Sequence, residues 1–295
     1  MTARTTLSPE DLADLDQAVE RLLLTGHRDE LTIIGAGEIT CVLEWRGFAC
    51  KRLPPFKDLA RVEAYRRLVE RYVTELRAVG IPVVDTALQS IARDAGYSAY
   101  IVQPRLPADW FLPPRLRAAS LTEALELLRP ILDHVQACQA ASVGIDAQLS
   151  NWSIKDGRPM LLDVTTPLLR DESGRDLLDT EIFVATLPVV ARGLVRRFLI
   201  ADLLDRFYDR RGVFLDLISN MANYGLVHFT EPFLAEVNAR LDRPLTMKDV
   251  LGYRRQEWWT WKAIRACLKM EQIWRRKVLR VRDPHLLPSQ FEGTL

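Results

Sequence analysis

The segment richest in residues suited to chemistry runs from Gly144 to Asp163 and has the sequence GIDAQLSNWSIKDGRPMLLD. Two short apolar runs flank an Asp-Gly turn, which predicts a β-hairpin whose ends lie side by side. Asn151 precedes the hairpin and Asp163 follows it, so their oxygens would form a hard site suited to Mg²⁺. Asp146, on the preceding loop, could orient a hydroxyl group and accept its proton. The simpler alternative is that these three residues only cap turns.

A glycine pair lies upstream, between two apolar runs. Gly35-Ala-Gly37 follows Leu31–Ile34 and precedes Thr40–Leu43, which predicts two strands joined by a glycine turn. Glycine lets backbone amides approach a phosphate closely, because it has no Cβ. An ordinary tight turn is the alternative. A dinucleotide site is not indicated, since no helix follows the glycines.

A single lysine closes the next predicted strand. Lys51 ends the apolar run Ala49-Cys-Lys, and its ammonium could bind phosphates or simply reach water. A predicted helix over 58–79 follows and offers Glu63, Glu70 and Glu75 as partners. We predict that Glu70, midway along this helix, pairs with Lys51.

Taken in order, these residues resemble the protein-kinase-like superfamily, which includes protein kinases and the aminoglycoside and choline phosphotransferases. The resemblance covers roughly residues 30 to 170. It rests on the series Gly35-x-Gly37, Val42, Ala49-x-Lys51, a helix glutamate, Asp146-x-x-x-x-Asn151, and Asp163 after a hairpin.

The resemblance implies an α+β bilobal fold, with a small antiparallel β-sheet lobe over residues 1–103 and a larger, mainly helical lobe over 104–295. It also implies an ATP- and Mg²⁺-dependent phosphotransferase, with Asp146 as the catalytic carboxylate and Asn151 and Asp163 as metal ligands. Lys51 would hold the α- and β-phosphates, and Glu70 would hold Lys51. The implied ATP site comprises Gly35, Gly37, Val42, Ala49, Lys51, Glu70 and Gln103.

Several departures from the family pattern concern the catalytic loop. Thr40 replaces the third glycine, and no histidine stands two residues before Asp146. Gln148 occupies the position where Lys or His commonly neutralises the transferred phosphate, a role that Arg170 could take over. The activation-segment motifs of protein kinases are absent from the sequence, which favours a small-molecule hydroxyl acceptor. A nucleotide-binding pseudokinase acting as an interaction module is the alternative.

The remaining elements would position this site. A helix should begin at Ser8-Pro9 and end near Gly26, and two more strands are expected over Thr86–Arg93 and Tyr97–Gln103. A hinge is predicted near residues 103–108. Beyond it the pattern is mainly helical from Leu121, with late helices near 176–187, 188–210, 212–223, 230–241, 246–251 and 254–280.

The composition excludes several classes of function. The 295 residues include 40 basic and 39 acidic side chains, so the net charge does not favour nucleic acid as a partner. The four cysteines are scattered, which indicates free buried thiols. Neither a signal peptide nor an apolar run long enough to span a membrane is present, and a cytoplasmic location is expected.

Two features of the second half lie outside the resemblance. Residues 254–282 interleave tryptophans with many arginines and lysines. The simpler interpretation is a half-buried helix with its tryptophans in the core, and the alternative is peripheral docking on anionic lipid or nucleic acid. Asp216, Asn220 and Asn223 share one predicted helix face and could line an acceptor pocket, or could simply be solvated.

Overall fold

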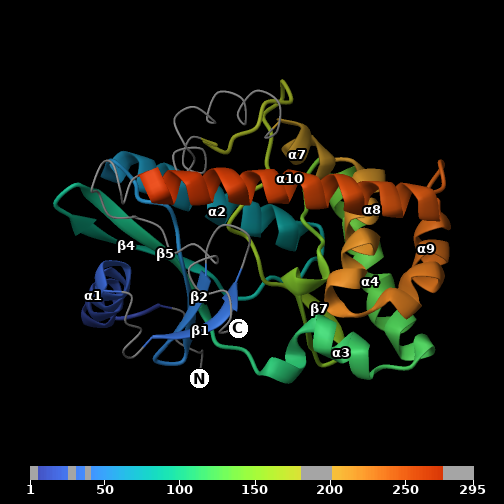
Figure 1. The fold of residues 1–295 in the computed structure, drawn as a ribbon, viewed down its shortest axis with the longest axis horizontal. Coiled ribbons are helices and arrows are strands. Elements are labelled where there is room, and N and C mark those ends of the chain that lie inside the picture. The colour runs from blue at the N-terminus through green and yellow to red at the C-terminus, as the bar shows by residue number, and fades with distance from the viewer. Residues whose placement is uncertain (1–5, 26–30, 37–40, 181–200, 275–295) are drawn as a thin grey trace.

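The computed structural model describes residues 6–25, 31–36, 41–180 and 201–274. An antiparallel sheet with one helix on each face forms the N-terminal part, and the C-terminal part is mainly helical (Figure 1). The protein is therefore of the α+β class, as the sequence predicts.

The sheet has five strands in the order β1-β2-β3-β5-β4, each antiparallel to its neighbour. This confirms the three consecutive strands and the later pair expected from the sequence. Their bounds are β1 Thr32–Ala36, β2 Cys41–Trp45, β3 Phe48–Arg52, β4 Ala87–Arg93 and β5 Gly96–Pro104.

The two faces of the sheet are covered by different helices. Helix α1 (Pro9–Thr25) packs on one face together with Cys50, Tyr100 and Val102. Helix α2 (Leu59–Ala78) packs with the opposite face. Because successive strand residues point to opposite faces, Lys51 lies on the α2 side, in register with the buried Ile101.

The C-terminal part is built from helices around a short hairpin. The hairpin pairs β6 (Trp152–Lys155) with β7 (Arg158–Leu161), and its turn is Asp156-Gly157. Both turn residues have positive φ, at 51° and 74°, a conformation for which Asp-Gly is favoured. The predicted hairpin is confirmed.

The helices of this part include α3 and α4, followed by α7 to α10 (Figure 1). Their bounds are α3 Leu112–Ala118, α4 Leu121–Ala140, α7 Ala201–Arg206, α8 Arg210–Asn220, α9 Thr230–Asn238 and α10 Met247–Trp274. Short 3₁₀ turns lie at Ala108–Trp110, Leu149–Asn151, Met221–Tyr224 and Val227–Phe229.

Some predicted boundaries were wrong. The helices expected over 246–251 and 254–280 form one continuous helix as far as the structure describes them, α10, because Gly252 is tolerated inside a helix and no proline interrupts it. Residues 275–280 lie outside the described residues. Residues 176–180 are not helical, and 207–209 form a turn between α7 and α8. Residues 181–200, part of two predicted helices, lie outside the described residues.

The larger hydrophobic cluster is continuous from α2 through the hairpin to α8. It includes Leu76, Ile81, Trp152 and Leu217, all at most 1% exposed. Cys41, Cys50 and Cys138 are buried thiols outside any disulfide, as the cysteine spacing predicts. None of the helices in the described part of the chain has the length and apolar character needed to cross a membrane.

Candidate functional site

The loop that carries Asp146 is shaped by alternating burial. Ile145, Ala147 and Leu149 are fully or almost fully buried, whereas Asp146 and Gln148 are only half-buried. In an extended segment, consecutive side chains point in opposite directions. The apolar residues therefore fix the loop to the core and direct the two polar residues away from it.

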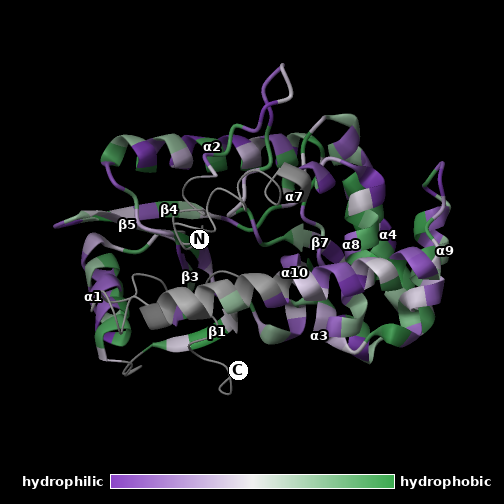
Figure 2. Ribbon diagram, turned by 45° about the horizontal axis from the view of Figure 1, so that its top comes forward, coloured by the Kyte–Doolittle hydropathy of each residue, from purple (hydrophilic) through white to green (hydrophobic). Residues whose placement is uncertain are grey.

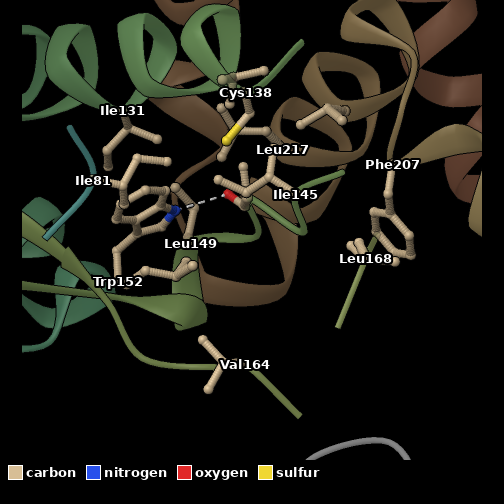
Figure 3. Close-up of a cluster of buried hydrophobic side chains, with 14 of the residues drawn as sticks. Ile81, Ile131, Cys138, Ile145, Leu149, Trp152, Val164, Leu168, Phe207 and Leu217 are labelled. Atoms are coloured by element: carbon tan, nitrogen blue, oxygen red, sulfur yellow. Dashed lines mark hydrogen bonds between the residues drawn. The ribbon is translucent and has the colours of Figure 1, made fainter. Parts of the chain in front are cut away.

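Trp152, at the start of β6, is hydrogen-bonded to the same loop. Its side chain is completely buried, and its indole nitrogen donates a hydrogen bond to the carbonyl oxygen of Ala147 at 3.2 Å (Figure 3). Ile81 and Ile131 lie around the ring in the same cluster (Figure 3). A buried indole N–H needs such a partner, so this contact sets the distance between loop and hairpin.

The hairpin brings its two ends together, as predicted. The Leu162 amide donates to the Asn151 carbonyl at 2.8 Å, which places Asp163 next to Asn151. The side-chain amide of Asn151 donates to the carbonyl of Asp146 at 3.3 Å. Asp146, Asn151 and Asp163 therefore lie on one side of the hairpin.

Lys51 from the sheet contacts this group directly. Its Nζ lies 2.8 Å from Oδ2 of Asp163 and 2.8 Å from Oγ1 of Thr165. Lys51 and Asp163 are 112 residues apart in the sequence. Strand β3 and the segment after β7 thus supply opposite charges to the same place.

The ionisation of Asp163 reflects this contact. Burial alone would raise the pKa of Asp163, but the Lys51 ammonium and the hydrogen bonds from Lys51 and Thr165 outweigh it and lower the pKa below its usual range. The Thr165 amide donates to Asp163 at 2.9 Å, and the Thr165 hydroxyl also bonds to this carboxylate. Asp163 is held as a carboxylate.

Asp146 has the opposite environment. Burial, followed by the negative charge of Asp216, raises its pKa to about 7, while the amide of Gln148, 3.2 Å from Oδ1, acts against this. The negative charge of Asp163 raises the pKa of Asp146 further, and the positive charge of Arg206 lowers it. Two nearby aspartates thus differ in ionisation, a pattern common at sites of proton transfer.

A buried polar cluster lies behind Asp146, centred on Asp216 of α8, whose side chain is 3% exposed. Tyr253 of α10 donates to Asp216 at 2.5 Å, and the Asn220 amide does so at 3.2 Å. Arg206 approaches the same oxygen at 3.5 Å, and the side chain of Gln148 also hydrogen-bonds Asp216. Burial nonetheless raises the pKa of Asp216 to about 6.

This cluster revises the predicted acceptor pocket. Asn220 is buried, and its Oδ1 accepts a hydrogen bond from Asn223 at 2.7 Å. Asp216 and Asn220 are therefore hydrogen-bonded to each other inside the protein, and the exposed Asn223 joins them from the surface. Gln148 is bound to Asp216 in the position where a cation was expected.

The predicted pairing of Glu70 with Lys51 is wrong in this structure, since the carboxylate on Lys51 is Asp163. Glu70 is exposed and lines a groove of about 800 Å³ between α1, α2 and β4. The other two candidates are engaged locally: Glu63 lies 3.1 Å from Arg66, and Glu75 lies 3.8 Å from Arg71.

Two tyrosines occupy the face of α2 that meets the site. Tyr65 donates to the carbonyl of Thr165, and Tyr72 donates to the carbonyl of Gly144 at 2.9 Å. They are seven residues apart and so share one helix face, from which Glu70 is turned well away. The helix thus holds both chain segments of the site by phenolic hydrogen bonds.

Gln103 lies where the predicted hinge begins and connects the two parts of the chain. Its side-chain amide donates to Thr86 at 2.8 Å and to the carbonyl of Leu162 at 2.7 Å. Leu162 directly precedes Asp163, so Gln103 fixes the position of the hairpin end relative to the sheet.

The other predicted nucleotide contacts lie on the first three strands. Val42 pairs with Lys51 and with Gly35, and Ala49 pairs with Gln103. A Cβ added at Gly35 would lie 3.7 Å from Val42, an ordinary contact, so packing does not require glycine there. Gly37 and Thr40 lie outside the described residues.

Arg170 is not available for the role suggested by the sequence. It pairs with Asp176 at 3.0 Å and with Asp205, and its guanidinium stacks 3.9 Å from the centre of the Tyr208 ring. Arg206 is the arginine whose charge acts on both Asp146 and Asp216.

The donor set fits Mg²⁺ through one amide and one carboxylate. Because the nitrogen of the Asn151 amide is directed to the Asp146 carbonyl, the amide oxygen is the atom left for a cation, beside Asp163. Within the described ranges, no three His, Cys, Asp or Glu side chains gather as a metal site. An ion here would have to take its remaining ligands from water and bound phosphate.

Several residues of the site were missed by sequence reasoning. Thr165, Tyr65 and Tyr72 carry no motif, and Arg206 and Tyr253 lie far along the chain from the loop that carries Asp146. The seven-residue spacing of the two tyrosines was a usable signal, since it marks one face of the helix over 58–79.

Comparison with characterised proteins gives no match to the chain. A family model described as "Family of unknown function (DUF6206)" matches residues 21–272, which include every candidate residue of the site. The protein is therefore a member of the DUF6206 family.

Proposed function

We propose that the protein is an ATP-dependent phosphotransferase with a bilobal protein-kinase-like fold, which transfers the γ-phosphate to a hydroxyl group of a small molecule. The observation that carries the proposal is the 2.8 Å contact between Lys51 and Asp163. This contact supports the proposal because it joins a cation of the sheet to a carboxylate at the end of the hairpin, next to the segment of Asn151 and Asp146.

The reaction uses the groups as follows. Lys51 would leave Asp163 to bind the phosphates of ATP. Asn151 and Asp163 would hold Mg²⁺, which would supply charge neutralisation at the phosphate oxygens. The acceptor oxygen forms a bond to the γ-phosphorus as the bond to the β-phosphate oxygen breaks, releasing ADP. Asp146 accepts the proton of the attacking hydroxyl. Its raised pKa suits a base that works near neutral pH.

The acceptor is proposed to be small because the sequence lacks the activation-segment motifs with which protein kinases dock peptides. A sugar or another alcohol fits the proposed chemistry.

A nucleotide-binding pseudokinase is the second candidate. The residue type at position 148 favours it, because the neutral Gln148 stands where related enzymes commonly have Lys or His, so the loop supplies no cation of its own there. The loss of one stabiliser of transition-state charge costs on the order of 10²–10³ in rate.

The test begins with a thermal-shift screen of nucleotides with Mg²⁺, since a ligand that binds the folded state raises apparent stability. Turnover is then measured with γ-labelled ATP and a panel of small hydroxyl acceptors. Asp146→Asn should reduce turnover by about 10²–10⁴ while the thermal shift with Mg-ATP remains.

The matched control is Asp156→Asn, the same change at the exposed hairpin turn, which should leave turnover unchanged. Nucleotide binding without turnover in the parent protein would identify the pseudokinase. The proposal fails altogether if no nucleotide raises the unfolding temperature.

A further inference from the structure

The first half of α10 presents an outward stripe that combines tryptophan with basic side chains. Leu251, Trp258 and Trp259 are 57%, 55% and 58% exposed. The stripe consists of these three residues with three exposed cations, Arg254, Arg255 and Lys262.

The stripe follows from helix geometry. Its members recur at intervals of three and four residues, so they share one face over about three turns. Val250 is buried and Tyr253 reaches Asp216, which marks the opposite face as the one packed on the protein. For Trp258 and Trp259 this outcome is contrary to the simpler sequence interpretation, in which the tryptophans lay in the core. The side chains of Trp261 and Trp274 lie outside the described residues.

We propose that this stripe docks the protein on an anionic lipid surface. All six members are apolar or basic, so the stripe complements a surface with an apolar boundary and negative headgroups. Tryptophan is suited to that boundary, because its ring is apolar and its N–H can remain hydrated. The chain as a whole has a formal net charge of only +1, so the attraction would come from this local patch.

The arrangement of the rings favours lipid over single-stranded nucleic acid. Trp258 and Trp259 pack edge to face, with centroids 4.7 Å apart and planes at 79°. Lys262 lies over both rings, at 4.5 and 5.2 Å from their centroids. Bases stack on open ring faces, and here Lys262 lies over a face of each ring. A compact pair of rings beside cations suits shallow insertion between headgroups.

The location of α10 fits a flat docking surface. In both ribbon views the helix begins beside α8 and α9 and extends along the outside of the molecule toward the side of the sheet (Figures 1 and 2). A straight, outward helix face can lie parallel to a membrane without any part of the chain entering it.

The experiment is sedimentation of the full chain with two kinds of vesicle, phosphatidylcholine alone and phosphatidylcholine with about a third phosphatidylserine. Binding should occur with the anionic vesicles only and should fall steeply between about 0.05 M and about 0.5 M salt. The double variant Arg254→Glu/Arg255→Glu should weaken binding at least about tenfold, since each cation near the surface contributes about 1 kcal/mol. Trp258→Ser/Trp259→Ser should weaken it comparably.

The matched control reverses the charge of two exposed arginines on α3, Arg115→Glu/Arg117→Glu, and should bind as the parent does. The same proteins are tested against a fluorescent single-stranded oligonucleotide. The proposal is overturned if the parent does not bind anionic vesicles at low salt, or if either α10 variant binds like the parent. It is also overturned if the α3 control loses binding equally, or if the oligonucleotide alone is bound.

Discussion

At the scale of single residues, the properties of the site depend on which of its carboxylates has a cation beside it. Asp163 is paired with Lys51, and Asp216 has Arg206 at 3.5 Å. Among the described residues, none forms an ion pair with Asp146. This asymmetry, together with burial, explains why the pKa of Asp146 rises while that of Asp163 falls.

The ionisation of Asp146 predicts a stability effect that does not depend on catalysis. Its folded pKa of about 7 lies above the value of about 3.9 for an unfolded aspartate, so the folded state binds more protons between these values. Stability should therefore fall as pH rises from about 4 to 7. Asp146→Asn removes this half-buried charge and should raise the unfolding temperature at pH 8 by roughly 2–5 °C.

The measurement is thermal unfolding of both proteins at several pH values. The gain should shrink toward pH 5, where Asp146 is largely protonated. Asp156→Asn, in the exposed turn, should show no such dependence. An equal rise in unfolding temperature at pH 5 and pH 8 would mean that the charge of Asp146 does not destabilise the folded protein.

At the scale of elements, the loop that carries Asp146 depends on close packing against the segment after the hairpin. A Cβ added to Gly144 would lie 2.7 Å from Cβ of Leu168 and 3.0 Å from the ring of Tyr208. The Gly144 amide also donates to the Leu168 carbonyl at 3.0 Å, so the two segments cannot separate freely. Only glycine fits this position without displacement of its neighbours.

Gly144→Ala should therefore lower the free energy of unfolding by about 1–3 kcal/mol. The same substitution at Gly252, in the exposed part of α10, should raise it by about 0.5–1 kcal/mol, because no neighbour lies within 4 Å and alanine favours helix. Urea unfolding of both variants checks the two signs. If Gly144→Ala changed the free energy of unfolding in the same direction and by the same amount as Gly252→Ala, the loop around Gly144 would not be closely packed.

At the scale of the whole molecule, the hydrophobic core does not divide where the sheet ends. The segment after α2 pairs with β7 through Val84 to Leu161 at 3.0 Å and Leu161 to Pro82 at 2.8 Å. Helix α2 belongs to the same buried cluster as Trp152 and Leu217. The sheet and the helical part are thus joined by a shared core as well as by the chain through Gln103.

This continuity predicts that the two parts unfold together. Far-ultraviolet circular dichroism and tryptophan fluorescence should give coincident urea transitions, because loss of α2 would expose the core around the hairpin. Two separated transitions would show that the sheet with its helices is an independent unit.

Helix α10 lies between the site around Asp146 and the proposed docking stripe. Tyr253 on its inner face binds Asp216, which is linked through Gln148 to the loop of Asp146. The proposed docking stripe lies on its outer face. The candidate site and the proposed membrane contact therefore share one helix.

The sequence by itself determined the local features of this protein. The Asp-Gly turn, the apolar alternation of the strands and the helix start at Ser8-Pro9 predicted β6–β7, the sheet and α1, because each depends on neighbouring residues. The hairpin likewise placed Asn151 beside Asp163. These relations are set by backbone geometry over a few residues.

Only the tertiary structure decided which distant side chains meet. Lys51 pairs with Asp163 and not with Glu70. The reason is that the packing of α2 directs Tyr65 and Tyr72 toward the site, which leaves Glu70 on the solvent side of the helix. The sequence also did not determine that Asp216 is buried or that Trp258 and Trp259 are exposed. An amphipathic pattern does not show which face of a helix packs against the rest of the protein. Such contacts depend on how helices pack across a hundred or so residues of intervening chain, where local propensity carries no information.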